Sequence, residues 1–318
     1  MNRSILRSLI LLFIIAALTI SLFACTPNVG KPDESSSDAQ SSPEEPSPAE
    51  STPEESTPDA STPDASTPDA STPEASESES EPETDPPKSP ITLNIGSYNI
   101  ANGLNFKRIT SIGTDIKSQN LDIVGVQEVD QFVDRTGRVD SMKMLSDASG
   151  LPYYAFFKAI NLQGGEYGVG ILSKYPITET DKIELDSGDK EQRVLGKAVI
   201  NVDGSLINFF VTHLSAEDKA LRPPQFSTIA ETVAPLDNFI ITGDFNTEKF
   251  TDYAVIKNAD MVNNATYSVN TIPNPNPTIS IDNIVFSKAN WSFDKPEVLK
   301  NGKSDHCLLY ATGTFDPN

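Results

Sequence analysis

The chain has 318 residues and a formal net charge of −21 at pH 7. Residues 1–90 hold 4 Lys and Arg against 17 Asp and Glu, which leaves 20 against 28 in residues 91–318. A domain with this excess of acidic groups repels polyanions on average, which argues against a non-specific DNA-binding protein unless a local patch or bound cations reverse the field.

The first residues have the pattern of an export signal. Arg3 and Arg7 precede an almost unbroken apolar stretch over residues 9–24, as in the charged and apolar regions of a signal peptide. The stretch ends in Leu-Phe-Ala-Cys at residues 22–25, which resembles the lipobox of bacterial lipoproteins and implies cleavage before Cys25 and lipidation of its thiol. An uncleaved transmembrane anchor is the alternative, because the stretch is close to the length that spans a bilayer.

Both interpretations export the rest of the chain, and we expect a protein that is lipid-anchored on the extracellular face of a bacterial cell membrane. The chain has two cysteines. If Cys25 is lipidated, Cys307 has no partner for a disulfide within the mature chain. Cys307 follows His306, but in its apolar run we expect a small buried thiol rather than a nucleophile.

A Ser, Thr, Pro and acidic segment follows Cys25 and continues to about residue 90. It contains a five-residue repeat from Ser51 to Ala75, beginning STPEE and STPDA. Too little apolar surface is available there to offset the entropy of ordering, so we expect a disordered, extended spacer. The predicted domains are a signal peptide over 1–24, the lipidated cysteine and linker over 25–90, and a catalytic domain over 91–318.

Short apolar runs broken by Gly, Asn, Asp and Pro begin after Pro90. Their patterns predict helices over 106–118, 139–148 and 222–233, and a short helix over 253–257. The predicted strands cover residues 91–100, 121–126, 153–157, 168–173, 177–185, 195–202, 206–212, 239–243, 281–287, 292–298 and 307–312. Many strands with a few interspersed helices favour two sheets packed face to face, with helices outside them.

Polar residues of catalytic type recur at the ends of these apolar runs, where a rigid sheet can hold a side chain toward a cleft. Both histidines of the chain belong to this set. Taken singly, each residue has another explanation, such as a turn residue or a solvated strand end. Together they would require six coincidences. The motifs are Ser97-Tyr98-Asn99-Ile100, Val126-Gln127-Glu128-Val129, Thr212-His213-Leu214, Gly243-Asp244-Phe245-Asn246, Ile281-Asp282-Asn283 and Ser304-Asp305-His306.

In this order the motifs resemble the endonuclease/exonuclease/phosphatase superfamily, the DNase-I-like proteins, over essentially all of residues 91–318. The resemblance implies an α/β fold that is a four-layer αββα sandwich, in which two packed mixed β-sheets are flanked by helices. It also implies a metal-dependent phosphoric ester hydrolase. A phosphate ester is then the expected substrate.

The resemblance also implies a metal site and its ligands. Glu128 corresponds to the principal ligand, with Asn99 beside it and Asp305 completing the site. Carboxylate and amide oxygens suit Mg²⁺, with Mn²⁺ as a second possibility, and disfavour zinc.

The remaining motif residues correspond to the groups that act on the phosphate. Asp244 resembles the residue that orients or deprotonates the attacking water, and Asn246 resembles a neighbour that contacts phosphate. His306, paired with Asp282, and His213 resemble the two histidines that face the phosphate. The resemblance leaves open whether Asp244 or His306 is the general base.

A second block, over residues 134–140, 153–160 and 164–177, resembles small bacterial members of the family. Arg135 and Tyr167 within it could line the cleft and contact substrate. Arg135 could equally be a surface ion-pair partner, and Tyr167 a core aromatic residue. Family members often have Asn where Val169 stands, so any polar contact of that Asn is absent here.

No stretch of interleaved basic and aromatic residues marks a nucleic-acid groove. We therefore expect a monomeric extracellular enzyme that acts on a phosphodiester or phosphomonoester of a lipid headgroup, a sugar or another small molecule. An extracellular DNA endonuclease or exonuclease is the first alternative. A catalytically inactive binding lipoprotein is the second, and the complete set of motif residues argues against it.

Overall fold

The computed structural model describes residues 89–103, 107–300 and 303–318. The predicted signal peptide, Cys25 and the linker lie outside the described residues. Among the residues that are described, no helix has both the length and the apolar character needed to cross a membrane.

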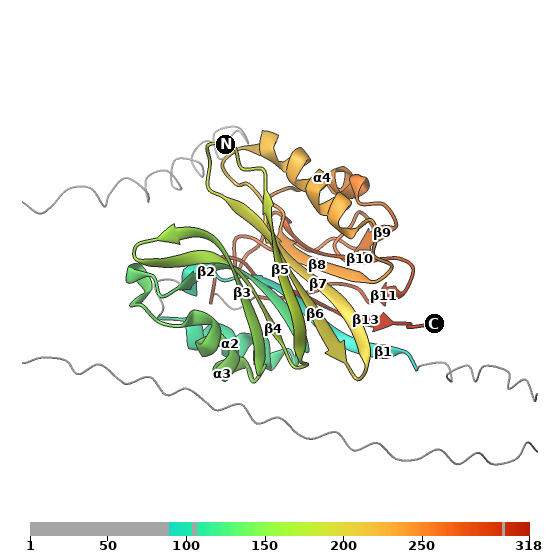
Figure 1. Ribbon diagram of the computed structural model, residues 1–318, viewed down its shortest axis with the longest axis horizontal. Coiled ribbons are helices and arrows are strands. Elements are labelled where there is room, and N and C mark those ends of the chain that lie inside the picture. The colour runs from blue at the N-terminus through green and yellow to red at the C-terminus, as the bar shows by residue number, and fades with distance from the viewer. Residues whose placement is uncertain (1–88, 104–106, 301–302) are drawn as a thin grey trace, which may run out of the picture. The chain divides into compact units, whose positions relative to one another are not determined.

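Two β-sheets form the centre of the described domain (Figure 1). The first sheet has the strand order β11-β13-β1-β2-β4-β3, with β12 beside β13, and the second has the order β5-β6-β7-β8-β10-β9. Strands of the first sheet are β1 (Ile91–Asn99), β2 (Ile123–Gln131), β3 (Tyr153–Leu162), β4 (Gly165–Ser173), β11 (Trp291–Phe293), β12 (Glu297–Leu299) and β13 (Leu308–Phe315). Strands of the second are β5 (Ile177–Leu185), β6 (Arg193–Val202), β7 (Ser205–His213), β8 (Phe239–Asp244), β9 (Ala259–Met261) and β10 (Asp282–Ser287).

An apolar layer fills the space between the two sheets. Alternating residues supply it, because successive side chains of a strand point to opposite faces. Leu93 and Ile95 of β1 contribute from the first sheet, and Phe209 and Val211 of β7 contribute from the second. These four side chains are fully buried.

Helices cover the outer faces of both sheets. The helices α2 (Ile109–Ser118) and α3 (Ser141–Ser149) pack on the first sheet through a second apolar cluster. Helix α4 (Arg222–Val233) packs on the second sheet through a third cluster, together with the 3-10 helix η5 (Phe250–Val255). The predicted four-layer αββα sandwich is therefore confirmed (Figure 1).

Some predicted elements differ from the structure. The strand expected over 292–298 is two strands, because the three residues 294–296 between β11 and β12 lie opposite only two residues of β13. Pro296, which has no N–H to donate to a ladder, lies in this interruption. The short helix expected over 253–257 is the 3-10 helix η5, which begins three residues earlier, and the short strand β9 was not predicted.

Two pairs of parallel strands set the position of the polar motifs. Strand β1 is parallel to β2 in the first sheet, and β7 is parallel to β8 in the second. The carboxyl ends of parallel neighbours lie at the same edge of a sheet. Asn99 ends β1, His213 ends β7 and Asp244 ends β8.

Candidate active site

Asp244 is the residue at which the polar motifs meet. Its side chain is 2% exposed, and its Oδ2 accepts a hydrogen bond from Asn99 Nδ2 at 3.1 Å. The same oxygen lies 3.6 Å from His213 Nε2 and 3.7 Å from His306 Nε2. Its Oδ1 accepts from the backbone N–H of Asn246 at 2.9 Å. Burial raises the pKa of Asp244, and the nearby charge of Asp282 raises it further.

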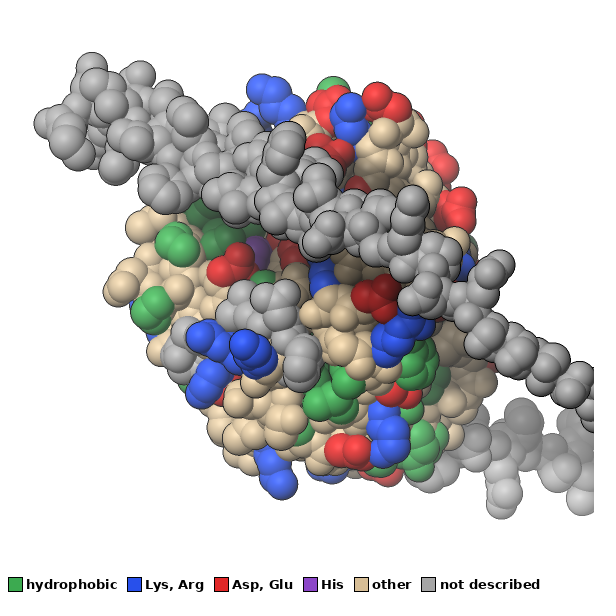
Figure 2. Space-filling view, turned by 90° about the vertical axis from the view of Figure 1, so that its left-hand side faces the viewer, with side chains coloured by type: hydrophobic (Ala, Val, Ile, Leu, Met, Phe, Trp, Pro, Cys, Tyr) green, Lys and Arg blue, Asp and Glu red, His purple; other side chains and the backbone are tan. Residues whose placement is uncertain are grey.

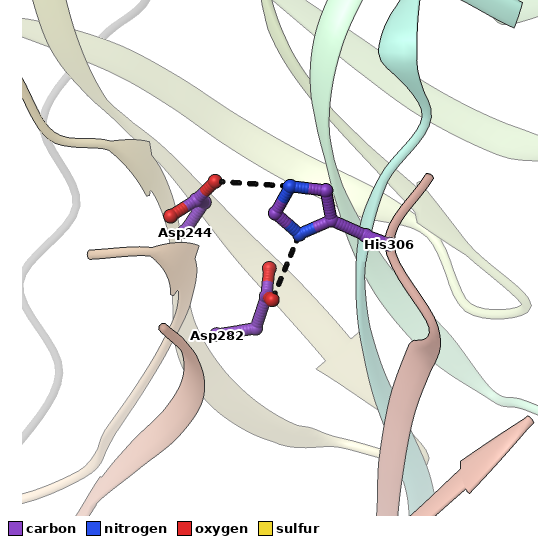
Figure 3. Close-up of side chains that lie close together, drawn as sticks. All are labelled: Asp244, Asp282 and His306. Atoms are coloured by element: carbon purple, nitrogen blue, oxygen red, sulfur yellow. Dashed lines mark hydrogen bonds and ion pairs between the residues drawn. The ribbon is translucent and has the colours of Figure 1, made fainter. Parts of the chain in front are cut away.

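His306 and Asp282 form a buried pair beside Asp244 (Figure 3). His306 Nδ1 lies 2.9 Å from Asp282 Oδ2, and Asp282 is the cross-strand neighbour of Asp244. Burial alone would lower the pKa of His306, but Asp282, through its charge and hydrogen bond, and the charge of Asp244 together raise it to about 10. The imidazole is therefore held with Nδ1 toward Asp282 and Nε2 toward Asp244.

The motif suggested that Glu128 stands at the end of a strand, but the structure places it within β2. Strand β2 continues to Gln131, and its register with β4 shifts between Val126 and Val129. Glu128 lies in this bulge with a φ of 60°, a conformation that costs a non-glycine residue on the order of 1–3 kcal/mol. A bulge redirects a side chain locally. Here Glu128 Oε1 accepts from Asn99 Nδ2 at 3.0 Å.

Asn99 thus connects the two carboxylates through one amide group. It is fully buried, its Nδ2 donates to both Glu128 and Asp244, and its Oδ1 accepts from the backbone N–H of Ala101 at 3.1 Å. The amide nitrogen, rather than the oxygen expected of a metal ligand, faces Glu128. In this arrangement Asn99 orients the carboxylates of both sheets.

Glu128 and Asp305 carry the carboxylate oxygens that a hard cation prefers. Burial raises the pKa of Glu128, and the charge of Asp305 raises it as well, so two carboxylates repel each other here. Asp305 is exposed, and its Oδ1 lies 3.3 Å from Ser304 Oγ, which donates to the backbone oxygen of Asn99 at 2.7 Å. Carboxylate oxygens in such a position suit Mg²⁺ or Mn²⁺, so Glu128 and Asp305 could hold such an ion.

Asp244, Asp282 and His306 also place ligand-type atoms within 4.8 Å of one another. A metal there is chemically possible. The hydrogen bond between His306 Nδ1 and Asp282 Oδ2 uses one atom of each group, whereas Asp282 Oδ1 has no hydrogen-bond partner in the described part of the chain.

Asn246 and His213 complete the site. Asn246 Nδ2 donates to the backbone oxygen of Leu214 at 3.0 Å, which connects the ends of β7 and β8. Burial lowers the pKa of His213 well below its usual value, and the charges of Arg193 and His306 lower it further. His213 is therefore neutral. Histidine and acidic side chains lie close together on the face shown in Figure 2.

The two residues proposed for substrate contact have partners within the domain. Arg135 Nε and Nη2 donate to the two oxygens of Asp130 at 2.7 Å each, and its guanidinium lies 5.7 Å from the ring centroid of Tyr167. Tyr167 is 8% exposed. These contacts match the ion-pair and core-aromatic alternatives, and they position both residues next to the bulge of β2, since Tyr167 is the partner of Asp130 across the strands.

Arg193 is the residue near the site that the sequence reasoning missed. It is the first residue of β6, it is 7% exposed, and its charge acts on Glu128, His213 and Tyr167. An arginine that directly precedes the apolar pair Val194 and Leu195 was the available signal, because arginine is rarely buried without a specific partner.

Comparisons with known proteins agree with this fold. A family model described as "Endonuclease/Exonuclease/phosphatase family" matches residues 91–306, whereas no curated protein matches. An endonuclease/exonuclease/phosphatase family protein from Bacteroides thetaiotaomicron superposes with a TM-score of 0.58 at 20% identity, covering 72% of this chain and 100% of that one.

Two other solved structures have known activities or ligands in their descriptions. The mannosyl-6-phosphatase of Bacteroides thetaiotaomicron VPI-5482 has a TM-score of 0.55 at 20% identity, covering 69% of this chain and 98% of that one. The TDP2 protein of D. rerio, complexed with single strand DNA product, has a TM-score of 0.55 at 19% identity, covering 70% of this chain and 98% of that one. At these identities the likenesses show a shared fold.

Proposed function

This chain belongs to the endonuclease/exonuclease/phosphatase family and is a metal-dependent phosphoric ester hydrolase. We propose that it is an extracellular Mg²⁺-dependent phosphoesterase that acts on a small phosphate ester. The observation that carries the proposal is the position of Asp244. Its Oδ2 lies within 4 Å of His213, His306 and Asn99. Groups from both sheets therefore converge on one carboxylate.

In the proposed reaction, water attacks phosphorus in line with the leaving oxygen. Asp244 accepts the proton of this water, because it is buried and its raised pKa makes it a stronger base than an exposed aspartate. His306, held by Asp282 at Nδ1, directs Nε2 to the phosphoryl oxygens. Neutral His213 offers them a hydrogen bond.

A Mg²⁺ ion held by Glu128 and Asp305 would offset the negative charge that develops on the phosphoryl group. Asn99 keeps Glu128 in place by donating to its Oε1. The same amide holds Asp244, so the orientation of the ligand and that of the base are coupled through one side chain.

A small substrate is favoured by the charge of the domain. Residues 91–318 hold 20 basic against 28 acidic side chains, which disfavours a polyanion such as DNA. The mannosyl-6-phosphatase shows that this fold accommodates a phosphosugar in another protein. A phosphosugar, a lipid headgroup or a similar small ester is the proposed substrate class.

A substrate screen tests the proposed activity. The full-length chain, in detergent, is incubated with phosphosugars, phospholipids and plasmid DNA, with Mg²⁺ or with a chelator. We expect phosphate release from a small ester in Mg²⁺ alone. Nicking of plasmid at low salt without turnover of the small esters would instead establish the DNA nuclease, and no turnover of any substrate by a chain that binds no Mg²⁺ would favour the inactive binding protein.

The export signal supports a proposed location on the outer face of the membrane. The basic and apolar residues that precede Cys25 are the basis of this proposal. When the chain is expressed in a bacterium, we expect the wild type in the membrane fraction. In labelling with a lipid precursor, we expect the wild type to carry the label and Cys25→Ser to lack it. Equal lipid labelling of the two would contradict the proposal.

A further inference from the structure

Arg193 carries a buried hydrogen-bond donor that the described residues leave unpaired. Its Nε is inaccessible to solvent and has no hydrogen-bond partner in the described part of the chain. Its Nη1 lies 3.1 Å from Glu191 Oε1. Glu191 Oε1 accepts no hydrogen bond within the described residues, so this contact is an ion pair only.

A buried polar group without a hydrogen-bond partner destabilises the folded chain, and more so when the group is charged. Native proteins keep few such groups, and each one needs an explanation. A guanidinium in this state is satisfied when a ligand supplies the acceptor. The side chain is 8% exposed, so part of it reaches the surface although Nε does not.

The location of Arg193 identifies the ligand. Strand β6 pairs with β7 so that Leu195 is opposite Thr212, which places Arg193 beside the strand end that carries His213. The positive charge of Arg193 contributes to lowering the pKa values of Glu128 in the first sheet and of His213 in the second. The strand register therefore places Arg193 next to the end of β7, where His213 stands at the proposed phosphate position.

We propose that Arg193 binds a non-bridging oxygen of the substrate phosphoryl group, and that Glu191 holds the guanidinium in the orientation this requires. The inference rests on the proposed phosphoesterase function. The planar fork of arginine matches the spacing of phosphate oxygens and binds them with charge-assisted hydrogen bonds. The ligand class is a phosphate oxyanion, as the ester before hydrolysis and as inorganic phosphate after it.

The test is calorimetric titration of inorganic phosphate, in the presence of Mg²⁺, into the full-length wild-type chain and into Arg193→Gln. Loss of a charge-assisted contact should weaken phosphate binding roughly 10- to 100-fold. The matched control is Arg138→Gln, because Arg138 is an exposed arginine whose side chain pairs with Asp134. We expect this control to bind phosphate as the wild type does. Phosphate affinity in Arg193→Gln equal to that of the wild type overturns the proposal.

A second measurement is made on the wild-type chain, so it does not require that Arg193→Gln folds. In the wild-type chain the arginine Nε–H signal of Arg193, assigned by its absence in Arg193→Lys, should shift when phosphate is added. A signal that is unmoved at saturating phosphate overturns the proposal.

The failures of the two proposals are distinguishable. If the wild type hydrolyses a phosphate ester while Arg193→Gln keeps full phosphate affinity, the assignment of Arg193 fails alone. If phosphate binds through Arg193 but the wild type hydrolyses no ester, the proposed function fails and the oxyanion site remains.

Discussion

At the scale of single residues, Asp244 is the group on which the proposed reaction depends. Replacing it with Asn keeps its size but removes the base. We expect Asp244→Asn to lower kcat by about 10²- to 10⁴-fold, measured as Mg²⁺-dependent phosphate release. The control is Asp181→Asn, an exposed aspartate of β5. Wild-type turnover in Asp244→Asn would exclude Asp244 as the base.

Asn99 carries a second prediction, because its amide holds Glu128 and Asp244 together. Asn99→Ala removes both hydrogen bonds to charged groups, each of which contributes about 1.5–3 kcal/mol. Loss of even one such hydrogen bond corresponds to at least a 10-fold fall, so we expect the activity of Asn99→Ala to fall at least 10-fold.

The control for Asn99→Ala is Asn94→Ala in the same strand. Asn94 also makes side-chain hydrogen bonds, to Asn120 and Thr312, but it lies at the other end of β1. Steady-state kinetics and thermal unfolding of both variants separate the two effects. If Asn94→Ala lost as much activity as Asn99→Ala, the loss would reflect stability rather than the site.

At the scale of elements, the closeness of the two sheets determines the site. A Cβ on Gly125 of β2 would overlap Thr242 Oγ1 of β8 and would lie 3.0 Å from Val211 Cγ2. Gly125 therefore allows the first sheet, which carries Glu128, to approach the second, which carries Asp244. We expect Gly125→Ala to lower stability by about 1–3 kcal/mol through overpacking and to lower kcat.

Thermal unfolding and kinetics of Gly125→Ala check this expectation. The double variant Gly125→Ala with Thr242→Ala removes the overlapping atom, so its loss of stability should be smaller than the sum of the two single losses. Additive losses would show that the close approach of the sheets is not what Gly125 provides.

The sequence predicted most elements and the positions of several candidate site residues at strand ends, for reasons that differ by residue. Asn99, His213 and Asp244 end apolar strands, and such ends are visible as a change from apolar to polar residues. The bulge at Glu128 was not predictable, because a register shift depends on which strand lies opposite. Arg193 was missed for a related reason: the sequence shows an arginine directly before an apolar pair, but only packing shows whether that arginine is buried.

At the scale of the whole molecule, a divalent cation should affect stability as well as activity. The charges of Glu128 and Asp305 repel each other. A ligand that binds only the folded state stabilises it by about 2.7 kcal/mol at 100 times its Kd. We therefore expect Mg²⁺ to raise Tm and a chelator to abolish turnover, with Mn²⁺ or Mg²⁺ restoring it.

Differential scanning calorimetry with and without Mg²⁺ checks the effect on Tm. Glu128→Gln should lose the Mg²⁺-dependent increase, and Glu179→Gln, an exposed residue of β5, should keep it. An equal increase in Tm for the wild type, Glu128→Gln and Glu179→Gln would show that the ion does not bind at Glu128.

The division of the reacting groups between two sheets has a consequence for folding. Glu128 and Asn99 come from one half of the sandwich, and His213 and Asp244 come from the other. A nascent chain in which the halves have formed but have not closed on each other holds neither a complete base nor a complete cation site. We therefore expect hydrolysis to begin only after the two sheets have packed against each other. During refolding, the time at which activity first appears would then report when the sheets pack together.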